Sequence, residues 1–292
     1  PELPNDLNIR SLLNKTQQER SIIMMQLSGV QNHFIRYLQV GGFPELALSG
    51  NDLMAQHIMR EDVVDKVLKR DLPALYNIRN ATELERIFLY LCNVSSEIVS
   101  VDAATKELSG VSRPTVENYI RYLESAKLIY QSWPVDMAGK KVLKARPKIY
   151  IADAAIRNAV LMDDSLLTDP VEMGKVVETA VYKHVASFYY QKATTVGYYR
   201  GGRKEMEVDI VVDCPNTKKI LIEVKYRENA HISDDAAICK LCGEAYAAII
   251  ITKNANDYGV HNTKEGKYML RIPAFAFLYM LGHTEKCGGK SI

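Results

Sequence analysis

The sequence predicts a mixed α/β chain of several domains, and three observations support this prediction. Residues 1–80 carry apolar side chains at helical spacing, for example from Ile22 to Leu38. Residues 81–152 combine short helical patterns with two strand-like runs. Residues 153–292 contain runs of β-branched residues in the predicted order helix, strand, strand, strand, helix, strand. We therefore expect three domains, one for each of these segments.

The composition is that of an ordinary globular protein. Of the 292 residues, 47% are hydrophobic and 25% are charged, which excludes a disordered, collagen-like or disulfide-rich chain. Uninterrupted apolar runs, such as that at 245–251, are much shorter than the ~18 residues of a membrane span. Five scattered cysteines are typical of a reducing compartment. We therefore expect a cytoplasmic protein without a membrane partner, and an oligomer remains open.

A Gly-Gly turn divides the N-terminal helical segment. The stretch 40–45 reads Val-Gly-Gly-Phe-Pro-Glu, and Gly-Gly followed by Pro does not continue a helix. A second helix is predicted from about Asp52 to Leu72, ending at Pro73. Residues 1–80 are therefore expected to be helices joined by turns.

Residues 81–152 follow the order helix, helix, turn, helix, strand, strand. The third helix opens at Ser112, a good N-cap residue, with Pro114 close behind it. The predicted helices and strands cover 83–92, 101–108, a stretch from 112, 129–135 and 148–152. This order predicts a winged helix-turn-helix domain.

The loop between the two predicted strands is basic. Segment 101–150 holds nine basic and five acidic residues, whereas the whole chain has a net charge of only +2. The basic residues on the third helix and in the loop include Arg113, Arg121, Lys140, Lys141, Lys144 and Arg146. Such a local excess of positive charge predicts contact with DNA phosphates. The alternative is a solvated loop on a winged helix that contacts only proteins.

Two neighbouring predicted strands of the third domain carry charged residues among β-branched ones. Alternate residues of a strand share a face, so Glu207 and Asp209 lie together, as do Glu223 and Lys225. A hairpin turn centred on Asn216 would set residue 209 opposite 223, although a slip of one residue would separate them. Two adjacent carboxylates can bind Mg²⁺, and a nearby lysine can orient water or stabilise developing negative charge.

The charged residues of these two strands also match a known motif. The PD-(D/E)XK pattern is formed by Asp209 on the first strand and by Glu223, any residue and Lys225 on the second. Glu178 on the preceding helix is a further ligand candidate. The pattern and the α-β-β-β-α-β order resemble the restriction-endonuclease-like fold. The resemblance implies Mg²⁺-dependent phosphodiester hydrolysis, with Asp209 and Glu223 as metal ligands and Lys225 and Glu178 as further catalytic residues. The alternative is an inactive nuclease-like fold that binds protein or DNA.

Further motifs occur in one order along almost the whole chain. They are Tyr37-Leu-x-x-Gly-Gly-Phe-Pro-Glu45, Lys69-Arg-Asp71, Tyr150-x-x-Asp153 and Gly174-x-x-x-Glu178, followed by the acidic strands. With these motifs the chain resembles the C-terminal portion of prokaryotic, archaeal-like AAA-type ATPases that end in a nuclease-like domain of unknown function. The resemblance implies that residues 1–80 are a lid segment and that a P-loop ATPase core precedes them.

The P-loop itself is missing from this sequence. No stretch matches G-x-x-x-x-G-K-[ST], the loop whose backbone and lysine hold nucleotide phosphates. This chain alone is therefore not expected to bind ATP, which would bind only in a longer protein. Because residue 1 is Pro, we expect an excised C-terminal piece whose partners are the ATPase core and DNA.

Overall fold

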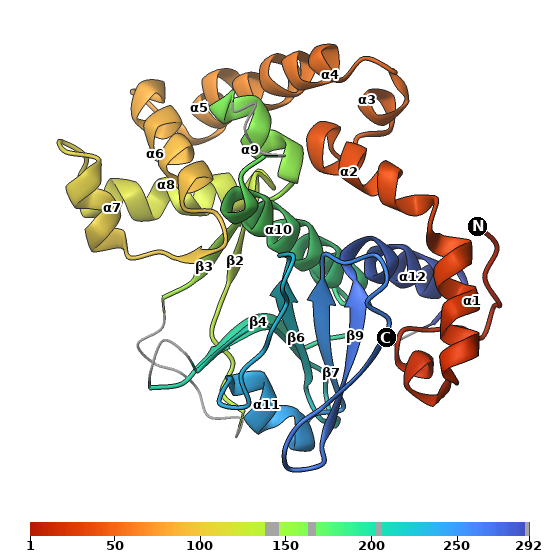
Figure 1. Cartoon of the computed structure of the whole chain (residues 1–292). Helices are drawn as coiled ribbons and strands as arrows, with labels where there is room; N and C mark the ends of the chain where they lie inside the picture. Colours follow the sequence, from red (N-terminus) through yellow and green to blue (C-terminus); the bar gives the residue numbers. More distant parts are fainter. Residues whose placement is uncertain (138–145, 163–167, 203–205, 290–291) are drawn as a thin grey trace. The chain divides into compact units, whose positions relative to one another are not determined.

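The computed structural model describes residues 1–137, 146–162, 168–202, 206–289 and 292, and it has a mixed α/β fold (Figure 1). The chain divides into two compact units, and each of them is assembled from separated stretches of sequence. The sheet unit comprises Pro1–Phe34, Trp133–Ala145 and His184–Ile292. The helical unit comprises Ile35–Ser132 and Arg146–Lys183. The three predicted domains are consecutive stretches of sequence, whereas the two units are defined by packing. The division into three domains therefore stays a prediction.

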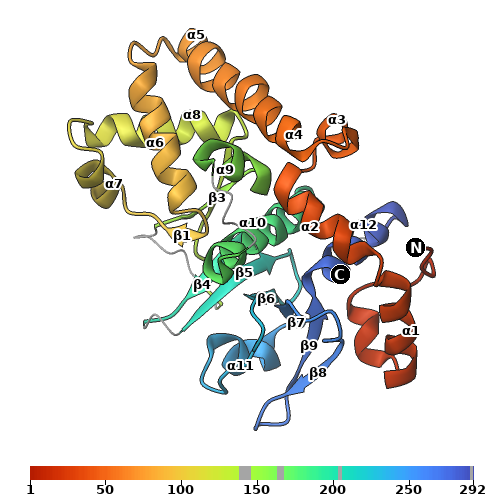
Figure 2. The same cartoon turned by 45° about the horizontal axis from the view of Figure 1, so that its top comes forward.

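The sheet unit is built on a six-stranded mixed sheet with the order β4-β5-β6-β7-β9-β8 (Figures 1 and 2). Its strands are β4 (Thr195–Arg200), β5 (Glu207–Asp213), β6 (Ile220–Lys225), β7 (Ala247–Thr252), β8 (Gly259–Asn262) and β9 (Tyr268–Pro273). The strands β6, β7 and β9 run parallel, while β4, β5 and β8 join antiparallel. Every residue of β7 is buried, as expected for a central parallel strand.

Short helices complete the sheet unit. They are η1 (Arg10–Asn14), α1 (Gln17–Leu27), α11 (Ala237–Leu241), η5 (Cys242–Glu244) and α12 (Ala274–Lys286). The helix α11 packs in one apolar cluster with Leu221, Ala248 and Ile250 of the sheet. Because side chains alternate along a strand, Glu223 and Lys225 of β6 point to the same face as Leu221. The face covered by α11 is therefore also the face of the predicted acidic site.

The helical unit contains the three helices and two strands predicted for residues 81–152, together with an additional short strand, β1. The elements are α6 (Ala81–Asn93), β1 (Glu97–Ile98), α7 (Val101–Glu107), α8 (Arg113–Ser125), β2 (Ile129–Ser132) and β3 (Lys148–Ile151). The strands form a three-stranded antiparallel sheet in the order β1-β3-β2. The side chain of Ser112 accepts a hydrogen bond from the backbone of Thr115, which confirms the predicted N-cap. The short strand β1 has no sequence signal of its own.

Further helices of this unit are α2 (Val30–Val40), α3 (Pro44–Leu48), α4 (Asp52–Ile58), η2 (Met59–Asp65), η3 (Val67–Asp71), α5 (Leu72–Tyr76), α9 (Ala154–Leu161) and the first part of α10 (Pro170–Phe188). The prediction that the second helix ends at Pro73 is wrong. The helix continues through a π-helical stretch to Tyr76 and ends at Asn77, which has a left-handed conformation. In a π-helix the hydrogen bonds run from residue i+5 to residue i, so the carbonyl that would meet the proline ring is displaced.

Within the described residues, no helix has both the length and the apolar character that crossing a bilayer requires.

Candidate metal site and surrounding polar clusters

The turn between β5 and β6 lies where the sequence predicts it. Thr217 N–H donates to the carbonyl of Cys214 at 3.4 Å, which closes a four-residue turn. Pro215 and Asn216 occupy the two central positions, and Asn216 has a φ of 57°. Proline followed by a residue with positive φ is typical of a type II turn. The predicted centre of the hairpin is therefore confirmed.

The turn also fixes the register of the two strands. Ile210 pairs with Ile222 across the antiparallel ladder. Continued by one residue, this register sets Asp209 opposite Glu223, as predicted. Both carboxylates therefore lie at the same end of the β5–β6 pair.

The side chain of Asp209 takes over the role of a backbone acceptor. Its Oδ2 accepts a hydrogen bond from Val224 N–H at 2.8 Å. This bond lies just beyond the last ladder pair, Ile210 with Ile222. The side chain thus holds β6 at the point where the main-chain ladder stops. The Asp209 carboxylate is fixed next to the Glu-x-Lys segment for this reason.

Glu223 and Lys225 form an ion pair on β6. Glu223 is buried, with 6% of its surface exposed, and its Oε1 lies 2.5 Å from Lys225 Nζ. Burial alone would lower the pKa of Lys225, but the carboxylates of Glu223 and Asp209 outweigh this effect and raise it. The lysine is therefore an ammonium group paired with Glu223 and favoured by the negative charge of Asp209.

The carboxylates of Asp209 and Glu223 suit one divalent cation, Mg²⁺. This ion commonly uses one or two carboxylates, here from neighbouring strands, and keeps several waters. The described residues contain no group of three or more His, Cys, Asp or Glu that would hold a metal on protein ligands alone. A closed tetrahedral zinc site, which needs four protein ligands, therefore does not fit the described residues. Asp209 and Glu223 are the residues that would hold Mg²⁺.

Glu178, the fourth predicted site residue, lies in the helical unit on α10. Its Oε1 accepts hydrogen bonds from Tyr150 Oη at 2.8 Å and Lys148 Nζ at 3.2 Å. Lys148 and Tyr150 are both buried residues of β3. These contacts give Glu178 a structural role within its own unit, and its role as a metal ligand stays a prediction.

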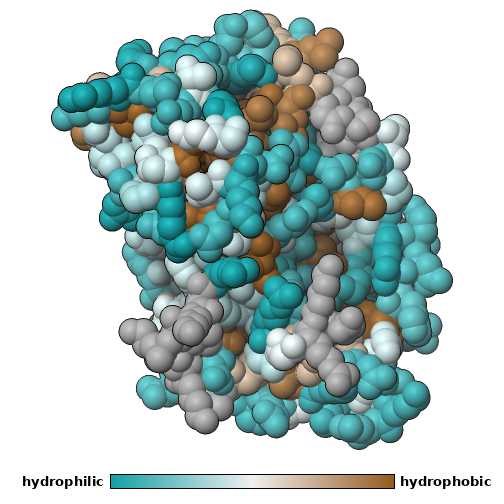
Figure 3. All heavy atoms as spheres, turned by 90° about the vertical axis from the view of Figure 1, so that its left-hand side faces the viewer, coloured by the Kyte–Doolittle hydropathy of each residue, from teal (hydrophilic) through white to brown (hydrophobic). Residues whose placement is uncertain are grey.

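The predicted DNA-binding residues are described only in part. Lys140, Lys141 and Lys144 lie outside the described residues, and Arg146 follows them as an exposed residue. Arg113 forms ion pairs with Asp102 and Glu117, and Arg121 donates to Asn118 on the same helix. Viewed from the side of α7, the surface is mainly hydrophilic (Figure 3).

One buried cluster brings together two of the sequence motifs. Asp153, 3% exposed, accepts hydrogen bonds from Ala155 N–H at 3.0 Å and Gly42 N–H at 3.2 Å, and it contacts Lys183. The ammonium group of Lys183 also lies 5.7 Å from the ring centre of Tyr37. Burial and the nearby Asp153 carboxylate raise the pKa of Tyr37. The Gly-Gly turn is thus fastened to the start of α9, a contact that the sequence spacing alone does not predict.

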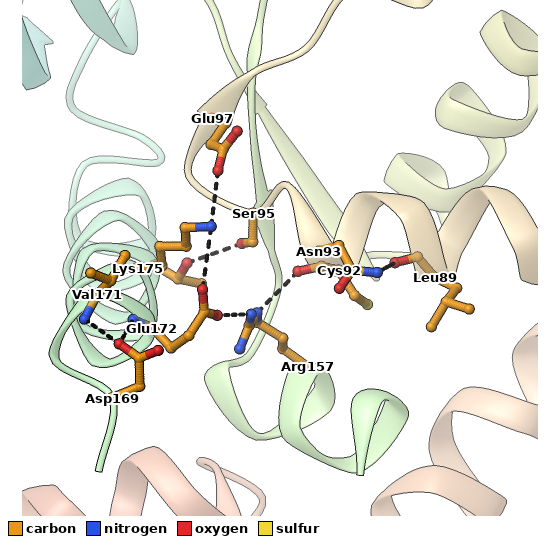
Figure 4. Close-up of polar contacts among 11 residues, drawn as sticks. Leu89, Cys92, Asn93, Ser95, Glu97, Arg157, Asp169, Val171, Glu172 and Lys175 are labelled. Carbon is orange, nitrogen blue, oxygen red and sulfur yellow. Dashed lines mark hydrogen bonds and ion pairs between the residues drawn. The ribbon is translucent and has the colours of Figure 1, made fainter. Parts of the chain in front are cut away.

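A second polar network in the helical unit surrounds Arg157 of α9 (Figure 4). Arg157 contacts Glu172 and donates through Nε to the carbonyl of Cys92 at 3.0 Å. Lys175 extends the network, with Nζ 3.4 Å from Glu172 Oε1 and 2.9 Å from Glu97 Oε1. The buried arginine was not recognised from the sequence, because α9 itself was not predicted.

Comparison with known proteins finds similarity to two domains of unknown function. A family described as "Domain of unknown function (DUF8612)" matches residues 31–167, and one described as "Domain of unknown function (DUF4143)" matches residues 173–275. An uncharacterized protein of Haemophilus influenzae is 22% identical over 70% of this chain and 55% of its own length. An uncharacterized protein of Methanocaldococcus jannaschii is 23% identical over 65% of this chain and 39% of its own length. No solved structure matches the chain. The chain therefore spans only part of these two relatives, and both of its matched segments resemble domains without a known function.

Proposed function

We propose that the sheet unit is a nuclease-like domain that binds Mg²⁺ through Asp209 and Glu223. The observation that carries the proposal is the β5–β6 register, which when continued by one residue sets the two carboxylates opposite each other, with Lys225 paired to Glu223. A register shifted by one residue would send Asp209 to the other face. The spacing of the PD-(D/E)XK pattern is thus matched by the strand geometry that such a site needs.

The chemistry of such a site is phosphodiester hydrolysis. Bound Mg²⁺ would supply Lewis-acid polarisation of a phosphoryl oxygen and a water of lowered pKa. Asp209 is held in place for this task by Val224 N–H, and Glu223 by Lys225. The ammonium group of Lys225 is placed to stabilise negative charge that develops on the phosphate.

A second candidate function is an inactive nuclease-like fold that serves as a binding platform. Two observations favour it: Lys225 already pairs with Glu223, and Glu178 already binds Lys148 and Tyr150. An internal ion-pair cluster of this kind needs no metal. In this case Asp209 and Glu223 would stabilise the end of the strand pair rather than bind Mg²⁺.

We further propose that residues 81–152 contact DNA as a winged helix. The order α6, β1, α7, α8, β2, β3 and the sheet order β1-β3-β2 support this assignment. Arg113 is neutralised by its two acidic neighbours, so Lys140 and Lys141 are the residues from which we expect the main contribution. Substitution of both lysines should weaken DNA binding and reduce its salt dependence. Unchanged affinity and salt dependence would reject the contact.

The resemblance to AAA-type ATPases supports one more proposal about the longer protein. The motifs Gly41-Gly-Phe-Pro-Glu45 and Tyr150-x-x-Asp153 that carry this resemblance meet in the buried cluster around Asp153. We propose that, in the longer protein, the two units of this chain act beside an ATPase core that binds ATP. Nucleotide binding by a longer protein, but not by this chain, is the expected result in a titration.

A cleavage assay tests the proposed nuclease function. Wild type and Lys225→Ala are incubated with Mg²⁺ or Mn²⁺ and with single-stranded, double-stranded and branched DNA and with RNA. We expect metal-dependent cleavage by wild type that falls in Lys225→Ala by at least about a hundredfold, the usual effect of losing one electrostatic stabiliser. Lys219→Ala, which removes a lysine paired with Asp213 at the other end of the hairpin, is the matched control. Metal binding without cleavage of any substrate would favour the binding platform.

A further inference from the structure

Arg227 is an exposed arginine close to the candidate metal site. It lies two residues beyond Lys225, the last residue of β6, and its backbone N–H donates to the Lys225 carbonyl at 2.9 Å. Its Nη2 donates to the carbonyl of His231 at 3.0 Å. Among the described residues, no carboxylate forms an ion pair with Arg227. Since a guanidinium group has five N–H donors, most of those of Arg227 are available to a ligand.

Lys225 and Arg227 place two positive charges at one end of β6. Burial and, to a smaller extent, the charge of Arg227 lower the pKa of Lys225, although the neighbouring carboxylates raise it overall. Glu228, the next residue, pairs with Lys253 and therefore adds no net negative charge. Two like charges that act on each other are unfavourable unless an anion binds between or beside them. The second cation thus indicates an anionic ligand at this end of the strand.

The charges of the site match two phosphodiester groups. With Mg²⁺ bound, the carboxylates of Asp209 and Glu223 balance the two positive charges of the ion. Lys225 and Arg227 then remain as two cations, and each phosphodiester of a nucleic acid carries one negative charge. A chain with a second phosphate beside the reacting one would therefore neutralise the site. An isolated phosphodiester would leave one cation without a partner.

We propose that Arg227 binds the phosphate next to the one at the metal, so that the site takes a polynucleotide chain rather than an isolated phosphodiester. This role rests on the nuclease function proposed above. A planar guanidinium suits phosphate, because it can donate two parallel hydrogen bonds to the oxygens. Ligands of open α/β sheets bind outside the carboxyl ends of the strands, and the parallel strands β6, β7 and β9 all end on this side (Figure 1).

Binding of a short, fluorescently labelled single-stranded DNA to wild type and to Arg227→Ala tests the contact. Ca²⁺ replaces Mg²⁺ as the hard cation, and electrophoresis checks that the DNA stays intact. In Arg227→Ala the affinity should fall by at least about tenfold, as expected for one lost charge-assisted hydrogen bond. The slope of log affinity against log salt concentration should become smaller by about 0.7. Lys218→Ala removes an exposed lysine at the other end of β6 and is the matched control, in which both values should be kept.

Hydrolysis kinetics with Mg²⁺ distinguish this contact from the nuclease function itself. The substrates are the same DNA and bis(para-nitrophenyl) phosphate, which has one phosphodiester and no neighbouring phosphate. The ratio of kcat/KM for DNA to kcat/KM for the small ester should fall by about tenfold in Arg227→Ala and stay constant in Lys218→Ala.

The outcomes separate the two proposals. No DNA binding by wild type, or unchanged affinity and salt dependence in Arg227→Ala, would overturn the Arg227 contact, even if metal-dependent cleavage is lost in Lys225→Ala as the nuclease function requires. Weaker binding by Arg227→Ala without cleavage of either substrate by wild type would support the phosphate contact and reject hydrolysis. Because Arg227 is exposed, its substitution removes no buried side chain, and an unchanged melting temperature without ligand confirms that the variant is folded.

Discussion

Gly41 gives the sharpest test of how the Gly-Gly motif is fastened to α9. Its φ is 81°, in the left-handed region that favours glycine. A Cβ atom at this position would lie 2.7 Å from Asp153 Oδ1 and 3.0 Å from the Cβ of Ala155. Asp153 cannot move away easily, because it is buried and holds Gly42 N–H and Lys183. Gly41→Ala should therefore break the cluster rather than shift one flexible side chain.

The loss in the free energy of unfolding that Gly41→Ala causes has two parts. The left-handed backbone costs a non-glycine residue about 1 to 2 kcal/mol. Displacing a buried carboxylate from its cationic partner costs about 3 kcal/mol more, at the low end for breaking a buried ion pair. Gly50→Ala is the matched control, because Gly50 has a φ of 70° and no atom within 4 Å of the added Cβ. This control should lose only the backbone part.

Urea unfolding followed by far-ultraviolet circular dichroism measures both variants. The only tryptophan, Trp133, lies in the sheet unit, so its fluorescence serves as an internal reference for that unit. We expect Gly41→Ala to lose at least about 2 kcal/mol more than Gly50→Ala. Equal losses in the two variants would refute the argument that Gly41 is needed for the close approach to Asp153.

Three further predictions concern packing, a buried charge and thiol reactivity. Gly197→Ala should prevent stable folding of the sheet unit, because its Cβ would lie 2.1 Å from a backbone oxygen; a normal melting curve would contradict this. Glu178→Ala should lower the free energy of unfolding by about 3 kcal/mol, since it removes the carboxylate that buried Lys148 contacts. A loss below about 1 kcal/mol in urea unfolding would contradict this structural role of Glu178. Cys287 is exposed, whereas burial raises the pKa of Cys92 to about 12. Mass spectrometry after brief alkylation of the native chain should therefore find Cys287 labelled and Cys92 unlabelled.

Apart from β1, the elements from α6 to β3 could be predicted because each of them has a local signal. The helices show helical periodicity, and Ser112 marks the start of α8. The register of β5 and β6 also follows from local chemistry, since Pro215 and Asn216 specify the turn. These signals are sufficient because the interactions that they describe are close in sequence.

Elements with distant partners were missed. The helix α9 (Ala154–Leu161) buries two polar residues, Arg157 and Asn158, so it lacks an amphipathic pattern. Asn158 donates to the carbonyl of Leu38, which is 120 residues away in sequence. The strands β8 and β9 form the far edge of the sheet, where β9 pairs with β7. Their pairing depends on tertiary contacts that no short stretch of sequence contains.

The most direct test of a metal site at Asp209 and Glu223 is a metal titration followed by thermal unfolding. Asp209→Asn is the decisive variant, because an amide oxygen can still accept the hydrogen bond from Val224 N–H while the charge is lost. Asp213→Asn, on the same strand but paired with Lys219, is the matched control. With a metal site at Asp209 and Glu223, Mg²⁺ or Mn²⁺ should raise the melting temperature of wild type and of Asp213→Asn but not of Asp209→Asn. An equal rise in Asp209→Asn, or no rise in wild type, would contradict a metal site at Asp209 and Glu223.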